Sequence, residues 1–241
     1  MSAIGVQLAN AGLQRMSSPG LGVESQYPIG LMADKDVWGQ SPDPMEQLVV
    51  SSALQVANAI RDASSGVQVF ESALGRVAQG ITQPAGPTLA RLATDTMYGQ
   101  KIATLDAQVA IGLEFTSSIQ QNGTNAESIV AYSMMQACDR LIDAPTTVDM
   151  TTIGFHTLAA GIQGPIGGVL GSVGAQCMNC RSAAGNIDEQ CAIGLAFTKA
   201  VQTYSTDSAV TNQATDALRA YSTADADSGK AILENFLLSA H

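Results

Sequence analysis

The sequence predicts an all-α protein built from tandem long helical hairpins with coiled-coil-like packing. Apolar residues recur from Val49 to Ile81 at alternating steps of four and three, the spacing of a seam between packed helices. The same stripe returns later in the chain, and Pro and Gly residues interrupt both stripes at matching positions. The low aromatic content, 5%, is typical of helices that approach each other through small side chains.

An internal repeat organises the chain. A hexapeptide of the form Ala-Ile-Gly-(Leu/Val)-x-(Phe/Leu) opens at Ala3, Ala110 and Ala192. Self-similarity at a fixed period is the signature of a repeat architecture. The chain matches itself at an offset of 81 and then, after one inserted residue, of 82; identical pairs include Val49 and Val130, Gln55 and Gln136, Pro84 and Pro165, Ile111 and Ile193, and Phe115 and Phe197. A shorter match at an offset of 163 pairs Ser65, Gly66, Glu71 and Leu74 with Ser228, Gly229, Glu234 and Leu237, and suggests a truncated third copy.

Each repeat is expected to begin with one long helix, helix A. In the second copy its apolar stripe runs from Val130 through Met134 and Phe155 to Ile162. A continuous helix of about 33 residues would be about 50 Å long. Pro and Gly residues then end helix A, at residues 83–87 in the first copy and 164–168 in the second.

A second helix, helix B, is expected to complete each hairpin. In the first copy Tyr98, Leu105 and Leu113 lie on one face, and a turn signal follows at Asn122 and Gly123. The predicted organisation is therefore an N-terminal fragment at residues 1–16 that resembles the end of a helix B, an irregular arm at 17–45, hairpin repeats at 46–128 and 129–211, and a C-terminal half-repeat, a helix A, at 212–241.

The arm admits two interpretations. Trp38 and Tyr27 favour ordered packing against another surface, as in a strap or docking loop, and the alternative is a flexible linker.

Composition and charge exclude several classes of protein. Eleven basic against 21 acidic residues give a net charge of −10, which argues against a nucleic-acid partner. The stretch from Met1 to Arg15 lacks the pattern of a secretory signal, so we expect a cytoplasmic protein. Residues 151–180 carry no Asp, Glu, Lys or Arg and are long enough to cross a bilayer, but Gly164 and Pro165 interrupt them, so a hairpin buried between subunits is expected instead of a membrane span.

Four cysteines are the main candidates for special chemistry, and Cys177 and Cys180 have the spacing of a zinc or redox motif. The first repeat does without them, since Ala57, Thr96, Gly99 and Val109 occupy the positions equivalent to Cys138, Cys177, Cys180 and Cys191. Free thiols packed as small hydrophobic groups are the expected state. Metal or cluster ligation and disulfides between subunits remain alternatives.

No enzyme motif is recognisable. The chain has two histidines, His156 and His241, and lacks a nucleophile elbow, a phosphate loop or a zinc-protease helix. We therefore assign no catalytic, cofactor-binding or metal residue and expect no cofactor. His156 is expected to be a satisfied or interface histidine.

The sequence resembles the R-body (refractile body) structural proteins, the RebB-like family. The resemblance rests on the Gly-x-x-Leu-x-Asn-Ala of residues 5–11, the run from Gly112 to Asn122, the Asp-Ala-Pro at residues 143–145 and the Ala/Gln-rich paired helices. Members of this family are small helical proteins that assemble into coiled cytoplasmic ribbons in bacteria. The resemblance further implies that acid extends the ribbon. Candidate titrating groups are then the repeated carboxylates Asp62 and Asp143, and Asp106 and Asp188.

The function expected from these patterns is that of a non-catalytic structural subunit that polymerises head to tail, with itself alone or with paralogous subunits. The C-terminal half-repeat of one subunit would pack beside the N-terminal helix fragment of the next, and such a heterologous contact produces filaments, ribbons or tubes. The alternatives are a viral or phage-like coat protein and a cysteine-based metal or redox module.

Overall fold

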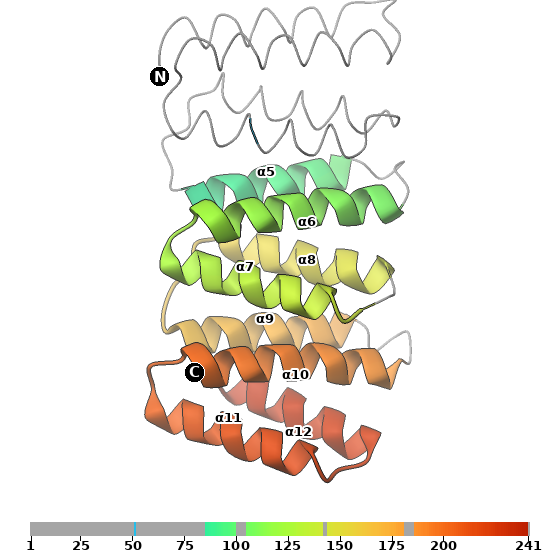
Figure 1. Cartoon of the computed structure of the whole chain (residues 1–241), viewed down its shortest axis with the longest axis vertical. Helices are drawn as coiled ribbons and strands as arrows, with labels where there is room; N and C mark the ends of the chain where they lie inside the picture. Colours follow the sequence, from blue (N-terminus) through green and yellow to red (C-terminus); the bar gives the residue numbers. More distant parts are fainter. Residues whose placement is uncertain (1–50, 52–84, 100–104, 142–143, 181–185, 241) are drawn as a thin grey trace, which may run out of the picture. The chain divides into compact units, whose positions relative to one another are not determined.

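The computed structural model describes Ser51 and residues 85–99, 105–141, 144–180 and 186–240. Every regular element in these ranges is an α-helix (Figure 1), which confirms the all-α class. The chain divides into two compact units, Met1–Gly123 and Thr124–His241. The described helices of the first unit are α5 (Ala85–Gly99) and α6 (Leu105–Asn122), and those of the second are α7 (Asn125–Cys138), α8 (Ala144–Ala159), α9 (Ile166–Cys180), α10 (Ile187–Tyr204), α11 (Ser208–Tyr221) and α12 (Ala226–Ser239).

Within each unit, consecutive helices fold back on each other as hairpins (Figure 1). The first unit contains the pair α5–α6, and the second contains α7–α8, α9–α10 and α11–α12. The middle pair holds the second unit together, because α10 contacts α7, α11 and α12 in addition to α9, and α9 contacts α8 and α12. The second unit is therefore a stack of three helical hairpins.

The prediction of one continuous helix A is wrong in the second copy. The stripe that begins at Val130 is divided between two helices, because α7 ends at Cys138 and α8 begins at Ala144. Pro145 explains the division, because a proline inside a continuous helix has no N–H for the carbonyl four residues earlier and its ring clashes with that carbonyl. In the first turn of a helix the backbone N–H has no partner within the helix, so Pro145 is tolerated at the start of α8. The stripe itself is buried on both helices, at Val130, Met134 and Ala137 on α7 and at Thr151, Phe155 and Leu158 on α8.

The predicted helix A of residues 212–241 is also two helices. Tyr221 ends α11 and Ala226 begins α12. Two hydroxyl groups stop α11 by donating to carbonyls of its last turn, from Ser222 to Arg219 O at 2.6 Å and from Thr223 to Ala220 O at 3.2 Å. The Asp225 side chain then accepts from the Ser228 backbone N–H at 2.8 Å and starts the next helix.

The prediction of helix B as a single helix is also wrong. In the first copy its residues form α5 and α6, which pack against each other, and in the second they form α9 and α10, which do the same. The predicted turn after helix B is present, since α6 ends at Asn122 and α7 begins at Asn125.

The three-dimensional structure follows the repeat of the sequence. Helices α5 and α9 begin at Ala85 and Ile166, and helices α6 and α10 begin at Leu105 and Ile187, so both pairs keep the offsets at which the sequence matches itself. The second repeat, which the structure describes in both halves, therefore contains four helices, α7 to α10, or two hairpins. Burial also repeats position by position, as at the fully or almost fully buried pairs Thr88 and Val169, Leu89 and Leu170, Leu92 and Val173, Met97 and Met178, Ile111 and Ile193, and Phe115 and Phe197.

The predicted breaker of the second copy separates α8 from α9. Gly161 and Gly164 adopt positive φ angles, 84° and 89°, where a residue with a Cβ is strained. Pro165 follows and directly precedes the first residue of α9. The predicted position of this break is confirmed, although Gly167 and Gly168 lie inside α9.

Glycines on α9 and α10 set the distance between neighbouring helices. A Cβ on Gly174 of α9 would lie 2.6 Å from the Cβ of Phe197 on α10, and one on Gly171 would lie 2.6 Å from the Leu237 carbonyl oxygen on α12. Such contacts are shorter than van der Waals packing allows. The middle hairpin can approach its neighbours this closely only because these positions lack a side chain.

Substituting Gly171 by Ala should destabilise the chain by about 1–3 kcal/mol, because the added methyl group meets a backbone oxygen that moves only with α12. This cost exceeds the gain in helix propensity, which is about 1 kcal/mol. Urea unfolding followed by circular dichroism measures the change.

The control is Ser172→Ala, at the next and exposed position of α9, which should change the free energy of unfolding by less than about 0.5 kcal/mol. Equal stability of the Gly171→Ala chain and the unsubstituted chain would contradict the close packing of α9 on α12.

Candidate functional site

The four cysteines lie in the second unit and are all free thiols. Cys138 ends α7, and its Sγ is 3.6 Å from the Thr151 hydroxyl of α8. Cys177, in the last turn of α9, is 1% exposed and directs its thiol to the Met150 carbonyl at 3.7 Å. Cys191 of α10 directs its thiol to the Ala226 carbonyl at 3.6 Å. Three of the thiols thus sit at contacts between helices, and Cys180 is exposed.

Burial makes the thiols poor nucleophiles. It raises the pKa of Cys138 from 9.0 to about 11, although the hydrogen bond with Thr151 acts in the opposite direction. The pKa of Cys177 is raised well above its ordinary value by burial and, less strongly, by the neighbouring Cys180, Cys138 and Asp149. Burial also raises the pKa values of Cys180 and Cys191. Reactive and metal-binding cysteines require the thiolate, whereas these environments favour the protonated thiol.

The equivalent position in the first repeat shows what Cys177 does. Thr96 of α5 occupies that position, is 2% exposed and donates its hydroxyl to the Leu92 carbonyl at 2.7 Å. A threonine and a cysteine of similar size thus fill the same buried place in two copies. Among the residues that the structure describes, no three His, Cys, Asp or Glu side chains form a group able to hold a metal ion.

The stretch without charged residues does not form a single long helix. It comprises parts of α8 and α9, separated by Gly161 and Gly164. His156, for which we expect the role of a satisfied or interface histidine, is exposed in the last turn of α8, one residue after the buried Phe155. Helices with the length and apolarity needed to cross a bilayer are absent from the described part of the chain.

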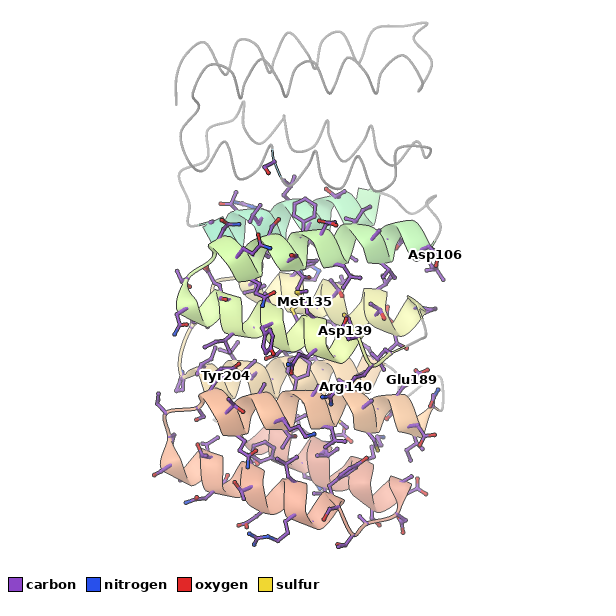
Figure 2. The ribbon with its side chains drawn as sticks, viewed as in Figure 1. Asp106, Met135, Asp139, Arg140, Glu189 and Tyr204 are labelled. Atoms are coloured by element: carbon purple, nitrogen blue, oxygen red, sulfur yellow. The ribbon has the colours of Figure 1, made fainter. Side chains whose placement is uncertain are left out.

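Two of the four candidate carboxylates are described, and they are not buried as a pH switch based on desolvation would require. Asp106 and Asp188 are exposed and occupy the first turns of α6 and α10 (Figure 2 labels Asp106). Their negative charges there interact favourably with the helix dipole. Asp62 and Asp143 lie outside the described residues, as do the N-terminal fragment and the arm at residues 1–45 with Trp38.

Several helices of the second unit start at capping residues that were not predicted from the sequence. Thr124 and Glu127 form a reciprocal capping box at α7, in which each side chain accepts from the other residue's backbone N–H, at 2.6 Å for the Thr124 N–H and 3.4 Å for that of Glu127. The pattern Thr-x-x-Glu was the signal for it. Asp207 and Asp225 cap α11 and α12. The hydrogen bond to the Ser228 backbone lowers the pKa of Asp225.

A hydrogen bond between two side chains joins the first hairpin of the second unit to the middle one. The Thr146 hydroxyl of α8 donates to Glu189 Oε2 of α10 at 2.9 Å. Figure 2 shows Glu189 near the start of α10. Asn186, the N-cap of α10, also donates to Glu189, through Nδ2 to Oε1 at 2.7 Å. This carboxylate therefore serves both the cap of its own helix and the packing of α8.

Comparison with known proteins gives no relative. No protein-family model matches the chain, and neither the curated proteins nor the solved structures contain a significant match to it.

The thiols should react slowly with a disulfide reagent in the folded chain. At pH 8 we expect Cys180 to react first, and Cys138, with a pKa of about 11, to react about a hundredfold more slowly than an unperturbed thiol. Absorbance after addition of Ellman's reagent measures the rates, and mass spectrometry assigns them to residues. The chain unfolded in guanidinium is the control, in which all four should react rapidly. Fast reaction of Cys138 or Cys177 in the folded chain would contradict their packing role.

Proposed function

We propose that this protein is a non-catalytic structural subunit that self-assembles head to tail into a filament, ribbon or tube. The observation that carries the proposal is that the same packing of helical hairpins recurs along the chain in step with the sequence repeat, as α5–α6 and again as α9–α10. In stacked repeats each unit contacts only its neighbours, so a contact made inside the chain can also be made between copies. A heterologous contact of this kind does not close on itself unless its rotation forms a ring.

The chemistry of the described side chains supports a packing role. The buried cysteines occupy helix contacts with raised pKa values, and Glu127, Asp207 and Asp225 cap helices. Glycines of α9 and α10 lie at the contacts between α9, α10 and α12. Such residues supply interfaces more readily than they supply a catalytic site.

The resemblance to the R-body structural proteins suggests the kind of assembly, a cytoplasmic ribbon that acid extends. In this proposal the segment with the hexapeptide motif that opens at Ala3 packs against the C-terminal hairpin of the next subunit. In α10 the same motif spans Ala192 to Phe197, and its Ile193 and Phe197 are fully buried. The coat-protein alternative shares this helical packing, and we prefer the ribbon because of the sequence resemblance.

The caps of the C-terminal hairpin suggest where acid acts. The pKa of Asp225 is lowered in the folded chain, so its stabilisation of α12 is present above the ordinary value of 3.8 and is lost as the pH falls through the lowered one. Acid should therefore loosen the start of α12.

The experiment is negative-stain electron microscopy of the purified full chain over a range of concentrations at neutral and acidic pH. We expect elongated assemblies of regular width whose length changes below about pH 4, where carboxylates become protonated. A chain that stays monomeric at the highest concentrations would refute the proposal.

Two variants locate the acid response. One changes Asp62, Asp106, Asp143 and Asp188 to Asn, and the other is Asp225→Asn, which keeps a capping side chain but does not titrate. The set that flattens the pH dependence contains the responsible groups. If neither set alters the response, the pH component of the proposal is wrong, and self-assembly is judged from the unsubstituted chain alone.

A further inference from the structure

The C-terminal hairpin is the structural equivalent of the first hairpin of the second unit. Helix α12, which begins at Ala226, corresponds to α8, which begins at Ala144, and α11, which begins at Ser208, corresponds to α7, which begins at Asn125. Burial shows the equivalence of α8 and α12 most clearly. Five buried positions of α8 coincide with five of α12 and its C-cap, namely Thr147, Thr151, Gly154, Phe155 and Leu158 with Gly229, Leu233, Phe236, Leu237 and Ala240.

Helix α8 carries a second stripe, which the middle hairpin covers. Thr146 and Met150 are 1% exposed, and Ile153 and Thr157 continue the stripe as half-buried residues. Thr146 donates to Glu189 of α10, and the Met150 carbonyl accepts from Cys177 of α9. These two contacts establish that this stripe faces α9–α10.

The equivalent stripe of α12 is open. Ser228, Asn235 and Ser239 are exposed, and Ile232 is half-buried. Leu238 flanks this stripe and is 53% exposed, the largest exposed fraction among the large hydrophobic residues that the structure describes. The stripe contains no charged residue.

The neighbouring helix shows the same change. Val130, Ser133 and Ala137 are buried on α7, whose neighbours in the second unit include α10. Their equivalents on α11 are Gln213, Asp216 and Ala220, all exposed. We call the two open stripes together, Gln213, Asp216 and Ala220 with Ser228, Ile232, Asn235 and Ser239, the outer face of the C-terminal hairpin.

We propose that the outer face binds a second copy of this chain, in the way that α7–α8 binds α9–α10 within the chain. This inference rests on the proposed function and names its surface. The internal interface shows which kind of partner fits the backbone of this face, namely a hairpin of the α9–α10 type. The motif of α10 occurs twice more in the chain, at residues 110–115 of α6 and at residues 3–8, which makes a second copy a matching partner.

The polar residues of the outer face make this contact weaker than the internal one. Gln213 stands where Val130 stands on α7, and Asn235 stands where Ile153 stands on α8. Each exchange removes apolar area that would be buried in the contact and adds an amide that must be desolvated. The face is therefore compatible with water in the free chain and forms a reversible contact at high concentration.

Sedimentation velocity of the full chain in about 150 mM salt, where exposed charges are screened, tests the proposal. One variant is expected to weaken the association of copies and another to strengthen it. Ile232→Asp should raise the concentration for assembly at least about tenfold, because it places a charge at the position equivalent to the buried Met150 of the internal contact. The control, Ser172→Asp, adds the same charge at an exposed position of α9 and should leave assembly unchanged. Circular dichroism verifies that both chains fold.

The gain variant combines Gln213→Val with Asn235→Ile and restores the residues of the first hairpin. It should lower the concentration for assembly at least about tenfold while keeping the regular width of the particles. Adding Ile232→Asp to it should reverse the gain. Unchanged assembly in both variants, or a gain that Ile232→Asp does not reverse, would overturn the outer face as the binding surface.

The unsubstituted chain separates the two proposals. If it assembles and the outer-face variants have no effect, this inference fails and the proposed function stands. If it stays monomeric and the gain variant does too, both fail. If only the gain variant assembles, the C-terminal hairpin is a water-adapted cap of the stack, which also overturns the inference.

Discussion

The stack of hairpins in the second unit depends on contacts between helices that are so close that one of the two helices must carry a glycine at the contact. Gly171 and Gly174 allow α9 to approach α12 and α10, and Gly194 allows α10 to approach Met178 of α9 and Leu233 of α12. Because a chain with 5% aromatic residues has few large groups to fill a core, close approach of the backbones takes the place of side-chain volume. Phe155 and Phe197, both fully buried, are among the few large side chains that add to it.

The same constraint explains why the repeat is visible in both sequence and structure. A residue that faces two neighbouring helices at short distance tolerates little change in size, so Leu89 and Leu170, and Phe115 and Phe197, recur in equivalent places. Positions that only one neighbouring helix covers tolerate larger changes in size and polarity, and the copies differ at such positions. The outer face of the C-terminal hairpin is such a divergence, since apolar residues of α7 and α8 are replaced there by Gln213 and Asn235.

The helical class and the buried stripe could be predicted from the sequence, but the number of helices could not be predicted from periodicity alone. Steps of four and three persist across the turn between α7 and α8, because two helices that fold back on one core bury the same face as one long helix would. Local signals marked the turns: Pro145 excludes a continuous helix, the Thr124 and Glu127 pair starts α7, and Asp225 starts α12. Burial of Cys138, Cys177 and Cys191 followed from their small equivalents in the first repeat, whereas Cys180, which was expected to be packed as well, is exposed. The outer face required the exposure of each residue, which no sequence pattern gives.

The most direct test of the account is a cryo-electron microscopy reconstruction of the full chain at a concentration where particles larger than a monomer form. We expect helical density of a neighbouring copy over Ile232 and Asn235, at the position that α9 and α10 take over Met150 and Ile153 within each copy. Particles joined through another surface, with these residues facing solvent, would contradict it.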